Sequence, residues 1–196
     1  MGTTTTSTRT RRQRLAKPRY NGKRMPLSDF REWTPEDGFK YEWDNGILKT
    51  TSGMKNKERL IVSRLSRQFA RTKAYQAGGE LLPETDTLFA PVNKVRIPDL
   101  AFFTYEQLLQ SEKGDEPIPA FVIEIISPTN TADESQTKLA DYFSSDVQVV
   151  WEIFPKNKLV RVYTSLKAVT ICTGDDVCSA APAIADFTIT PNQLFS

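Results

Sequence analysis

Two carboxylates stand inside runs of otherwise apolar residues, Asp99 in RIPDLAFF and Glu124 in FVIEIISP. Removing a carboxylate from water is costly unless a cation or hydrogen-bond donors compensate its charge. If the two runs are neighbouring strands, about 5 Å apart, both side chains reach one divalent cation, which would remove that cost. The alternative is that Asp99 caps a turn after Pro98 and Glu124 pairs with a nearby Lys or Arg.

The composition restricts the metal and the chemistry. The chain of 196 residues contains no His and two Cys, Cys172 and Cys178. Without imidazole, Ser-His-Asp catalysis, Cys-His catalysis and His-ligated metal sites are excluded, and two thiols are too few for a structural zinc site. Any bound ion must therefore be held by oxygen atoms, which favours Mg²⁺, Mn²⁺ or Ca²⁺.

Two further residues are candidates for the same chemistry. Lys138 falls on a predicted helix that follows Glu124, and from there its amine could point back toward the strand end, where water would attack a phosphate. Glu42, in YEWDNG, is an acid among aromatic residues. The alternatives are a solvated lysine on a surface helix and a hairpin glutamate with its carboxylate in water.

The elements that must position these residues follow from the hydrophobic pattern. FKYEWDNGILKT alternates around Asn45-Gly46, a pair that favours a type I′ turn, and so predicts a hairpin. Helical spacing in KNKERLIVSRLSRQFARTKAY predicts an amphipathic helix that ends at Gly78-Gly79. Strands are expected near 81–89, 95–103 and 120–126, a helix near 131–144, strands in VQVVWEIFP and KLVRVYT, and then short β segments with turns.

The first part of the chain differs from the rest. Residues 1–24 carry eight basic and no acidic residues, which leaves 18 basic against 24 acidic residues and a net charge of −6 for the remainder. With little to bury, residues 1–25 are expected to be a disordered basic tail, and residues 26–196 one mixed α/β domain. The tail either neutralises phosphates or is a solubilising extension, and a transit peptide is a third alternative. Its candidate nucleic-acid-binding residues are Arg9, Arg11, Arg12, Arg14 and Arg19.

Five segments in this order resemble the Uma-two family of restriction-endonuclease-like proteins, within the PD-(D/E)XK nuclease superfamily. They are LSDFREWTPEDGFKYEWDNGIL, RIPDLAFF, VIEIISPTN, KLADYF and VVWEIFP. The resemblance covers about residue 26 to the C-terminus. It implies a restriction-endonuclease-like mixed sheet flanked by helices, with an N-terminal hairpin and a C-terminal β extension. It also implies Asp99 and Glu124 as Mg²⁺ ligands, with Mn²⁺ as a substitute.

The resemblance assigns roles to the other candidates. The lysine of the superfamily usually lies two residues after the Glu, where this chain has Ile126, but in this family it lies on the following helix, which matches Lys138. Glu42 matches the acid before the Asp-Gly-like turn of the family. Two positions depart from the family pattern: Glu58 stands where members often have a His, and Asn45 interrupts the Asp-Gly pair. Both departures leave room for a degenerate nuclease.

These observations lead us to expect a Mg²⁺-dependent endonuclease that hydrolyses phosphodiester bonds in DNA, with catalytic residues Lys138, Glu42, Asp99 and Glu124. The alternative is a catalytically inactive nuclease-fold protein that binds nucleic acid or a protein partner. No apolar run approaches the roughly 18 residues of a membrane span, and no signal-peptide apolar region is visible. We therefore expect a cytoplasmic protein without membrane contact, whose partner is DNA; a homodimer is left open.

Overall fold

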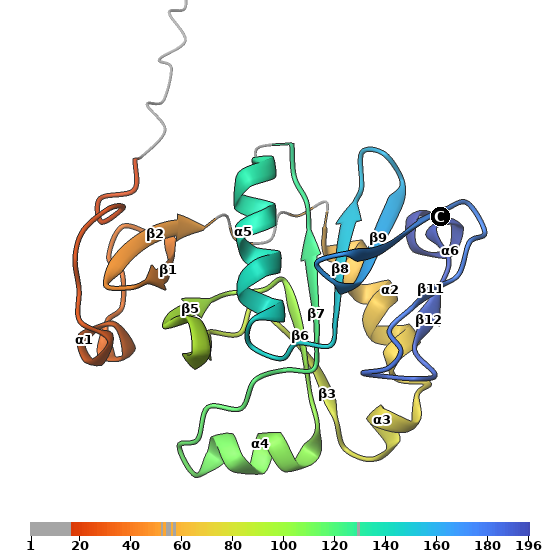
Figure 1. Ribbon diagram of the computed structural model, residues 1–196, viewed down its shortest axis with the longest axis horizontal. Coiled ribbons are helices and arrows are strands. Elements are labelled where there is room, and N and C mark those ends of the chain that lie inside the picture. Colours follow the sequence, from red (N-terminus) through yellow and green to blue (C-terminus); the bar gives the residue numbers. More distant parts are fainter. Residues whose placement is uncertain (1–16, 52, 54–55, 57, 129) are drawn as a thin grey trace, which may run out of the picture.

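A six-stranded mixed sheet forms the centre of the molecule, as seen in a computed structural model that describes residues 17–51, 53, 56, 58–128 and 130–196 (Figure 1). Its strand order is β10-β9-β8-β7-β6-β3. β7 and β8 are parallel, and the other neighbours are antiparallel. The strands are β3 (Glu80–Pro83), β6 (Leu100–Phe103), β7 (Phe121–Ile125), β8 (Val149–Phe154), β9 (Leu159–Ser165) and β10 (Ala168–Thr173).

A second, four-stranded sheet of order β2-β1-β5-β4 carries the N-terminal hairpin. It consists of β1 (Lys40–Asp44), β2 (Ile47–Thr51), β4 (Thr87–Phe89) and β5 (Lys94–Arg96). The predicted hairpin is confirmed: the turn residues Asn45 and Gly46 have φ of 49° and 89°, the two positive values that a type I′ turn needs. The helix α1 (Leu27–Glu32) and the short helix η1 (Ala90–Val92) flank this sheet.

Packing against the hairpin begins before the domain boundary that the sequence predicts at residue 26. The backbone N–H of Gly22 donates to Leu48, and that of Met25 donates to Gly46. The Tyr20 ring lies edge-on to Trp33 with 5.0 Å between ring centroids. Residues 20–25 therefore belong to the folded hairpin layer and not to the tail, while residues 1–16 lie outside the described residues.

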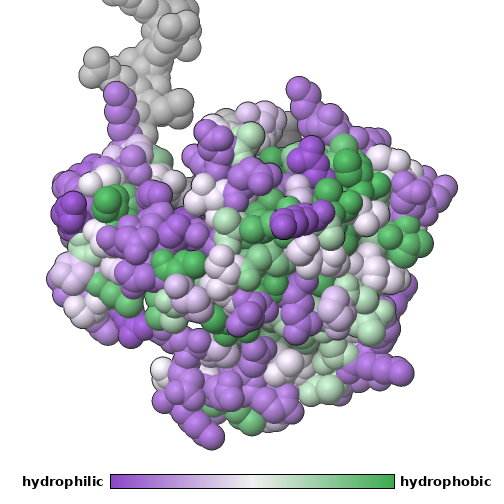
Figure 2. Space-filling model, in the orientation of Figure 1, coloured by the Kyte–Doolittle hydropathy of each residue, from purple (hydrophilic) through white to green (hydrophobic). Residues whose placement is uncertain are grey.

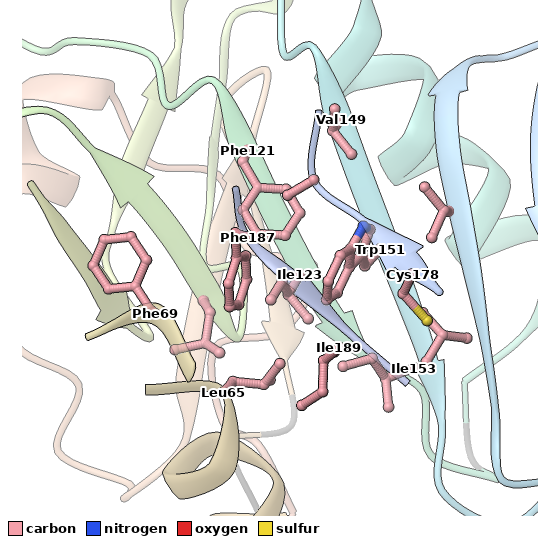
Figure 3. Close-up of a cluster of buried hydrophobic side chains, with 14 of the residues drawn as sticks. Leu65, Phe69, Phe121, Ile123, Val149, Trp151, Ile153, Cys178, Phe187 and Ile189 are labelled. Carbon is pink, nitrogen blue, oxygen red and sulfur yellow. The ribbon is translucent and has the colours of Figure 1, made fainter. Parts of the chain in front are cut away.

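Helices cover both faces of the central sheet. On one face, α2 (Arg59–Phe69), the pair β11 (Cys178–Ser179) and β12 (Thr188–Ile189), and the C-terminal α6 (Pro191–Phe195) enclose the main hydrophobic cluster. Figure 3 shows Phe69 of α2, Phe121 of β7 and Trp151 of β8 around Phe187. On the other face lies α5 (Ala132–Phe143), whose Leu139 and Tyr142 are buried. This arrangement confirms the predicted mixed sheet flanked by helices.

The helix α5 connects the parallel strands β7 and β8, which cannot be joined by a tight turn. Its start is fixed by a capping box, in which Thr131 accepts a hydrogen bond from the Glu134 backbone and the Glu134 side chain accepts one from the Thr131 backbone. Burial of Leu139 and Tyr142 sets the rotation of the helix. Lys138 is consequently placed over the end of β7.

Several predicted boundaries are wrong, because they depend on tertiary contacts. The long amphipathic helix is two helices, α2 and α3 (Lys73–Gln76), since Thr72 caps a new helix start. The predicted strands 81–89 and 95–103 are each divided between the two sheets. The helix α4 (Tyr105–Glu112) was not predicted, and the C-terminal segment ends in α6 and packs into the core. In the described part of the chain, no helix is both long and apolar enough to cross a membrane.

Candidate active site

The pairing of β6 with β7 brings Asp99 and Glu124 together. Leu100 lies opposite Ile123 in this antiparallel pair, so Asp99, which precedes β6, lies across from Glu124. Asp99 Oδ2 accepts a hydrogen bond of 2.6 Å from the backbone N–H of Ile125. Asp99 is thus bound to the neighbouring strand and does not cap its own turn.

Lys138 of α5 joins two of the predicted site residues. Its Nζ lies 3.1 Å from Oε1 and 3.2 Å from Oε2 of Glu124, and 3.0 Å from Oε1 of Glu42. One turn further along α5, the hydroxyl of Tyr142 donates to Oε1 of Glu124. The four predicted residues Asp99, Glu124, Lys138 and Glu42 therefore meet where β7, α5 and the hairpin converge.

Arg96 of β5 was not predicted as a site residue, and it binds the second carboxylate oxygen of Glu42. Its Nη1 lies 2.8 Å from Oε2 of Glu42, and its remaining nitrogens donate to Asp141 of α5. Lys94 of the same strand donates to Asp141 at 2.8 Å. Only 4% of the Arg96 side chain is exposed. The available signal was a cation between the two apolar residues Val95 and Ile97.

The second missed residue is Glu152 on β8. It is opposite Glu124 in the parallel pair and is 2% exposed. The hydroxyl of Ser135 donates to Oε1, and that of Tyr163 donates to Oε2 at 3.1 Å. The pattern that marks Glu124, an acid inside an apolar run, also occurs in VVWEIF, so the same reasoning would have found it.

These groups line an open cavity of about 520 Å³. Its walls come from the hairpin, from β5, from the length of α5, from β8 and from the end of β7. Glu42, Arg96, Glu124, Lys138 and Glu152 all lie on this wall. These charged side chains are therefore largely buried, yet a molecule that enters the cavity can reach them.

Burial and neighbouring charges set the protonation of the site. Burial raises the pKa of Asp99 to about 7, and the charge of Glu124 adds to this effect. Burial also raises the pKa of Glu124, although the Lys138 ammonium opposes it. Burial alone would lower the pKa of Lys138, but Glu124 and Glu42 outweigh it and raise that pKa. Burial alone would raise the pKa of Glu42, but Lys138 and Arg96 hold it below its ordinary value.

The pair Asp99 and Glu124 fits a hard divalent cation. The charge of Glu124 raises the pKa of Asp99, and a positive ion between the two carboxylates would oppose that effect. In the part of the chain that the structure describes, the Asp99 carboxylate accepts one hydrogen bond, from the Ile125 backbone to Oδ2, which leaves Oδ1 available. No group of three or more His, Cys, Asp or Glu among these residues is arranged to hold a metal. An ion on this pair would keep several waters, as Mg²⁺ commonly does.

Of the five arginines assigned to nucleic-acid binding, Arg19 alone falls within the described residues. Arg9, Arg11, Arg12 and Arg14 lie outside the described residues. Arg19 is exposed, its backbone N–H donates to Asp37 at 2.7 Å, and its guanidinium lies 5.7 Å from the centroid of the Tyr20 ring. It therefore belongs to the hairpin layer, with its charge facing solvent.

Comparison with known proteins identifies a family and a solved structure with a similar fold. The family model Uma2, described as "Putative restriction endonuclease", matches residues 27–192. The fold is similar to the crystal structure of "a putative nuclease belonging to DUF820 from Anabaena variabilis ATCC 29413", with a TM-score of 0.73 and 19% sequence identity. That match covers 87% of this chain and 97% of the other. No curated protein matches the sequence.

The buried ion pairs of Arg96 lead to a stability prediction. Arg96→Met should lower the free energy of unfolding by about 3 kcal/mol, because it leaves the buried carboxylates of Glu42 and Asp141 short of a cation. Arg31→Met should lower it by less than about 1 kcal/mol, because the Arg31–Glu116 pair is exposed. Urea unfolding measures the free energy of unfolding of both variants. Equal losses would show that the buried ion pairs of Arg96 contribute no more to stability than the exposed pair of Arg31.

Proposed function

The chain belongs to the Uma2 family, and we propose that it is a Mg²⁺-dependent endonuclease that hydrolyses phosphodiester bonds in DNA, with Mn²⁺ as an alternative ion. The proposal depends on the meeting of Glu124 and Lys138 at the wall of an open cavity, with Glu42 behind the lysine and Asp99 across from Glu124 on the neighbouring strand. Two carboxylates and one ammonium are the groups that metal-assisted phosphoryl transfer needs, and His is not required.

Asp99 and Glu124 are the proposed ligands of the ion. A divalent cation bound there supplies positive charge for the scissile phosphate and lowers the pKa of a bound water. Asp99 is oriented for this role by its hydrogen bond from Ile125, and Glu124 by the hydroxyl of Tyr142. Asp99 directly precedes β6 and Glu124 lies near the end of β7. The pairing of these two strands holds the distance between the carboxylates fixed.

Lys138 acts as a fixed charge and not as a base. Because Glu124 and Glu42 raise its pKa, its amine stays protonated and has no lone pair to accept a proton. An ammonium at this position orients the attacking water or stabilises the charge that develops on the phosphate. Glu42 holds the ammonium from behind, and Arg96 in turn holds Glu42.

A second candidate function is nucleic-acid or protein binding without turnover. It is favoured by the contacts of Glu124, whose two oxygens already accept from Lys138 and Tyr142, so an ion must compete with the lysine. The net charge of −6 outside residues 1–24 makes the domain a poor surface for a phosphate backbone, which within this candidate favours a protein partner over a nucleic acid. The experiments below distinguish this candidate from an enzyme.

The metal assignment predicts that Asp99→Asn abolishes ion binding. The wild-type melting temperature should rise with Mg²⁺ or Mn²⁺, because a ligand that binds only the folded protein stabilises it, whereas the variant should show no rise. Titration calorimetry with Mn²⁺ gives the affinities directly. Equal affinity in both proteins would remove Asp99 from the ligand set.

The role of Lys138 predicts a loss of rate without a loss of substrate affinity. Lys138→Ala should slow single-turnover cleavage of plasmid or single-stranded DNA by about 100-fold or more, because the contact acts mainly in the transition state. Lys113→Ala, at an exposed helix end, is the control and should cleave at the wild-type rate. Cleavage by Lys138→Ala at the wild-type rate would refute this role. If the wild-type protein binds DNA but cleaves no substrate, the second candidate function is favoured.

The basic residues of segment 1–16, which are Arg9, Arg11, Arg12 and Arg14, are proposed to contact phosphates, and the deletion is limited to this segment because residues 20–25 belong to the hairpin layer. This deletion should weaken DNA binding and flatten its dependence on salt, because each neutralised phosphate contributes about 0.9 to the slope of log K against log salt concentration. Fluorescence anisotropy over a salt series measures this slope. An unchanged slope would assign the segment to solubility alone.

A further inference from the structure

The two edges of the central sheet differ in their protection against further pairing. The edge strand β3 has four residues and carries Glu80 and Pro83 at its ends. The opposite edge strand, β10, has six residues, Ala168–Thr173, with no charge and no proline. Charges, prolines and short length are the usual means by which proteins prevent an edge from pairing. β10 has none of them.

The hydrogen-bonding groups of β10 show which residues are open to a partner. The N–H of Thr173 donates to the Asp176 side chain and its C=O accepts from the Asp176 backbone, so both point away from β9. Orientation alternates along an antiparallel strand, so the N–H and C=O of Val169 and Ile171 also point outward. Outside the sheet ladder, no hydrogen bond within the described chain engages these four groups.

The side chains of the same two residues are apolar and exposed. Val169 is 49% and Ile171 56% exposed, and both lie on the α5 face of the sheet, opposite Tyr163 and Arg161 of β9. In Figure 2, hydrophobic surface gathers over the region where β9 and β10 lie in Figure 1. An uncharged edge with exposed β-branched side chains is suited to adding another strand.

We propose that β10 pairs antiparallel with β10 of a second copy of this chain, with Thr170 facing its counterpart on a two-fold axis. This register sets Val169 opposite the partner's Ile171, and Ile171 opposite the partner's Val169. All four outward backbone groups of each strand are then used, and the exposed side chains form two cross-strand apolar pairs. If the register of the two β10 strands shifted by one residue, the outward-pointing N–H and C=O groups of one strand would face residues of the other whose N–H and C=O groups point toward β9.

Charge complementarity supports a second copy as the occupant. Lys167 precedes β10, and Asp175 and Asp176 follow it, so the strand has a basic and an acidic end. Antiparallel pairing brings Lys167 of each copy to the acidic end of the other. A two-fold axis makes this complementarity reciprocal, as isologous dimers require.

The pairing would join two six-stranded sheets into one continuous sheet. Directly opposed residues of an antiparallel pair point to the same face, so the α5 faces of both copies lie on the same side. The two cavities that contain Glu124 and Lys138 therefore open on one face of the dimer. The pairing itself does not depend on the catalytic proposal.

The oligomeric state tests the proposal. Wild type should sediment as a dimer at micromolar concentration, and the double variant Val169→Lys, Ile171→Lys should be a monomer with an unchanged circular dichroism spectrum, because four like charges would meet at the axis. Leu60→Lys, on α2 and also 56% exposed, is the matched control and should remain dimeric. A monomeric wild type, or a dimer that persists in the double variant, would overturn the proposal.

A cross-link tests the register. Facing residues in a non-hydrogen-bonded antiparallel pair have Cα atoms about 4.5 Å apart, within the range of a disulfide. Thr170→Cys should therefore give a covalent dimer on mild oxidation that dithiothreitol reverses. Thr173→Cys should not, because its counterpart lies about 20 Å away. Cross-linking of Thr173→Cys in preference to Thr170→Cys would refute this register.

Discussion

The candidate site depends on a buried chain of alternating charges, Arg96–Glu42–Lys138–Glu124. Each carboxylate in it would be costly to bury alone, and each is held by a cation from a different element. Arg96 comes from the hairpin sheet and Lys138 from α5, so the chain also fixes these two elements against the end of β7. Among the described residues, Asp99 forms no ion pair, which makes it the place where an added ion has most effect.

This arrangement explains why the lysine can lie on a helix. In the superfamily that the sequence resembles, the lysine usually follows the Glu on the same strand, where this chain has Ile126. Here the helix α5 crosses back over β7 because the parallel connection to β8 requires it, and this brings Lys138 over Glu124. Lys138 thus reaches Glu124 from a helix and not from the strand that carries Glu124. Because Glu42 also binds the Lys138 ammonium, the ammonium does not pair with Glu124 alone.

Local patterns were enough to predict some elements and not others. Asn45-Gly46 fixes its hairpin because both turn residues adopt positive φ, and the acids inside apolar runs identified Asp99 and Glu124. The division of the predicted strand 95–103 between two sheets could not be predicted, because it depends on which neighbours each half finds. Arg96 was missed for a related reason: its importance lies in Glu42 and Asp141, which are 54 and 45 residues away. Glu152 was within reach of the same rule that selected Glu124.

We propose that Asp99 and Glu124 hold a divalent ion that the lysine of α5 does not replace. Anomalous diffraction from crystals soaked in Mn²⁺ locates such an ion. A peak is expected between the two carboxylates, with the Lys138 ammonium still bound to Glu42. Crystals that show no peak there, with Lys138 still on both oxygens of Glu124 at saturating Mn²⁺, would contradict it.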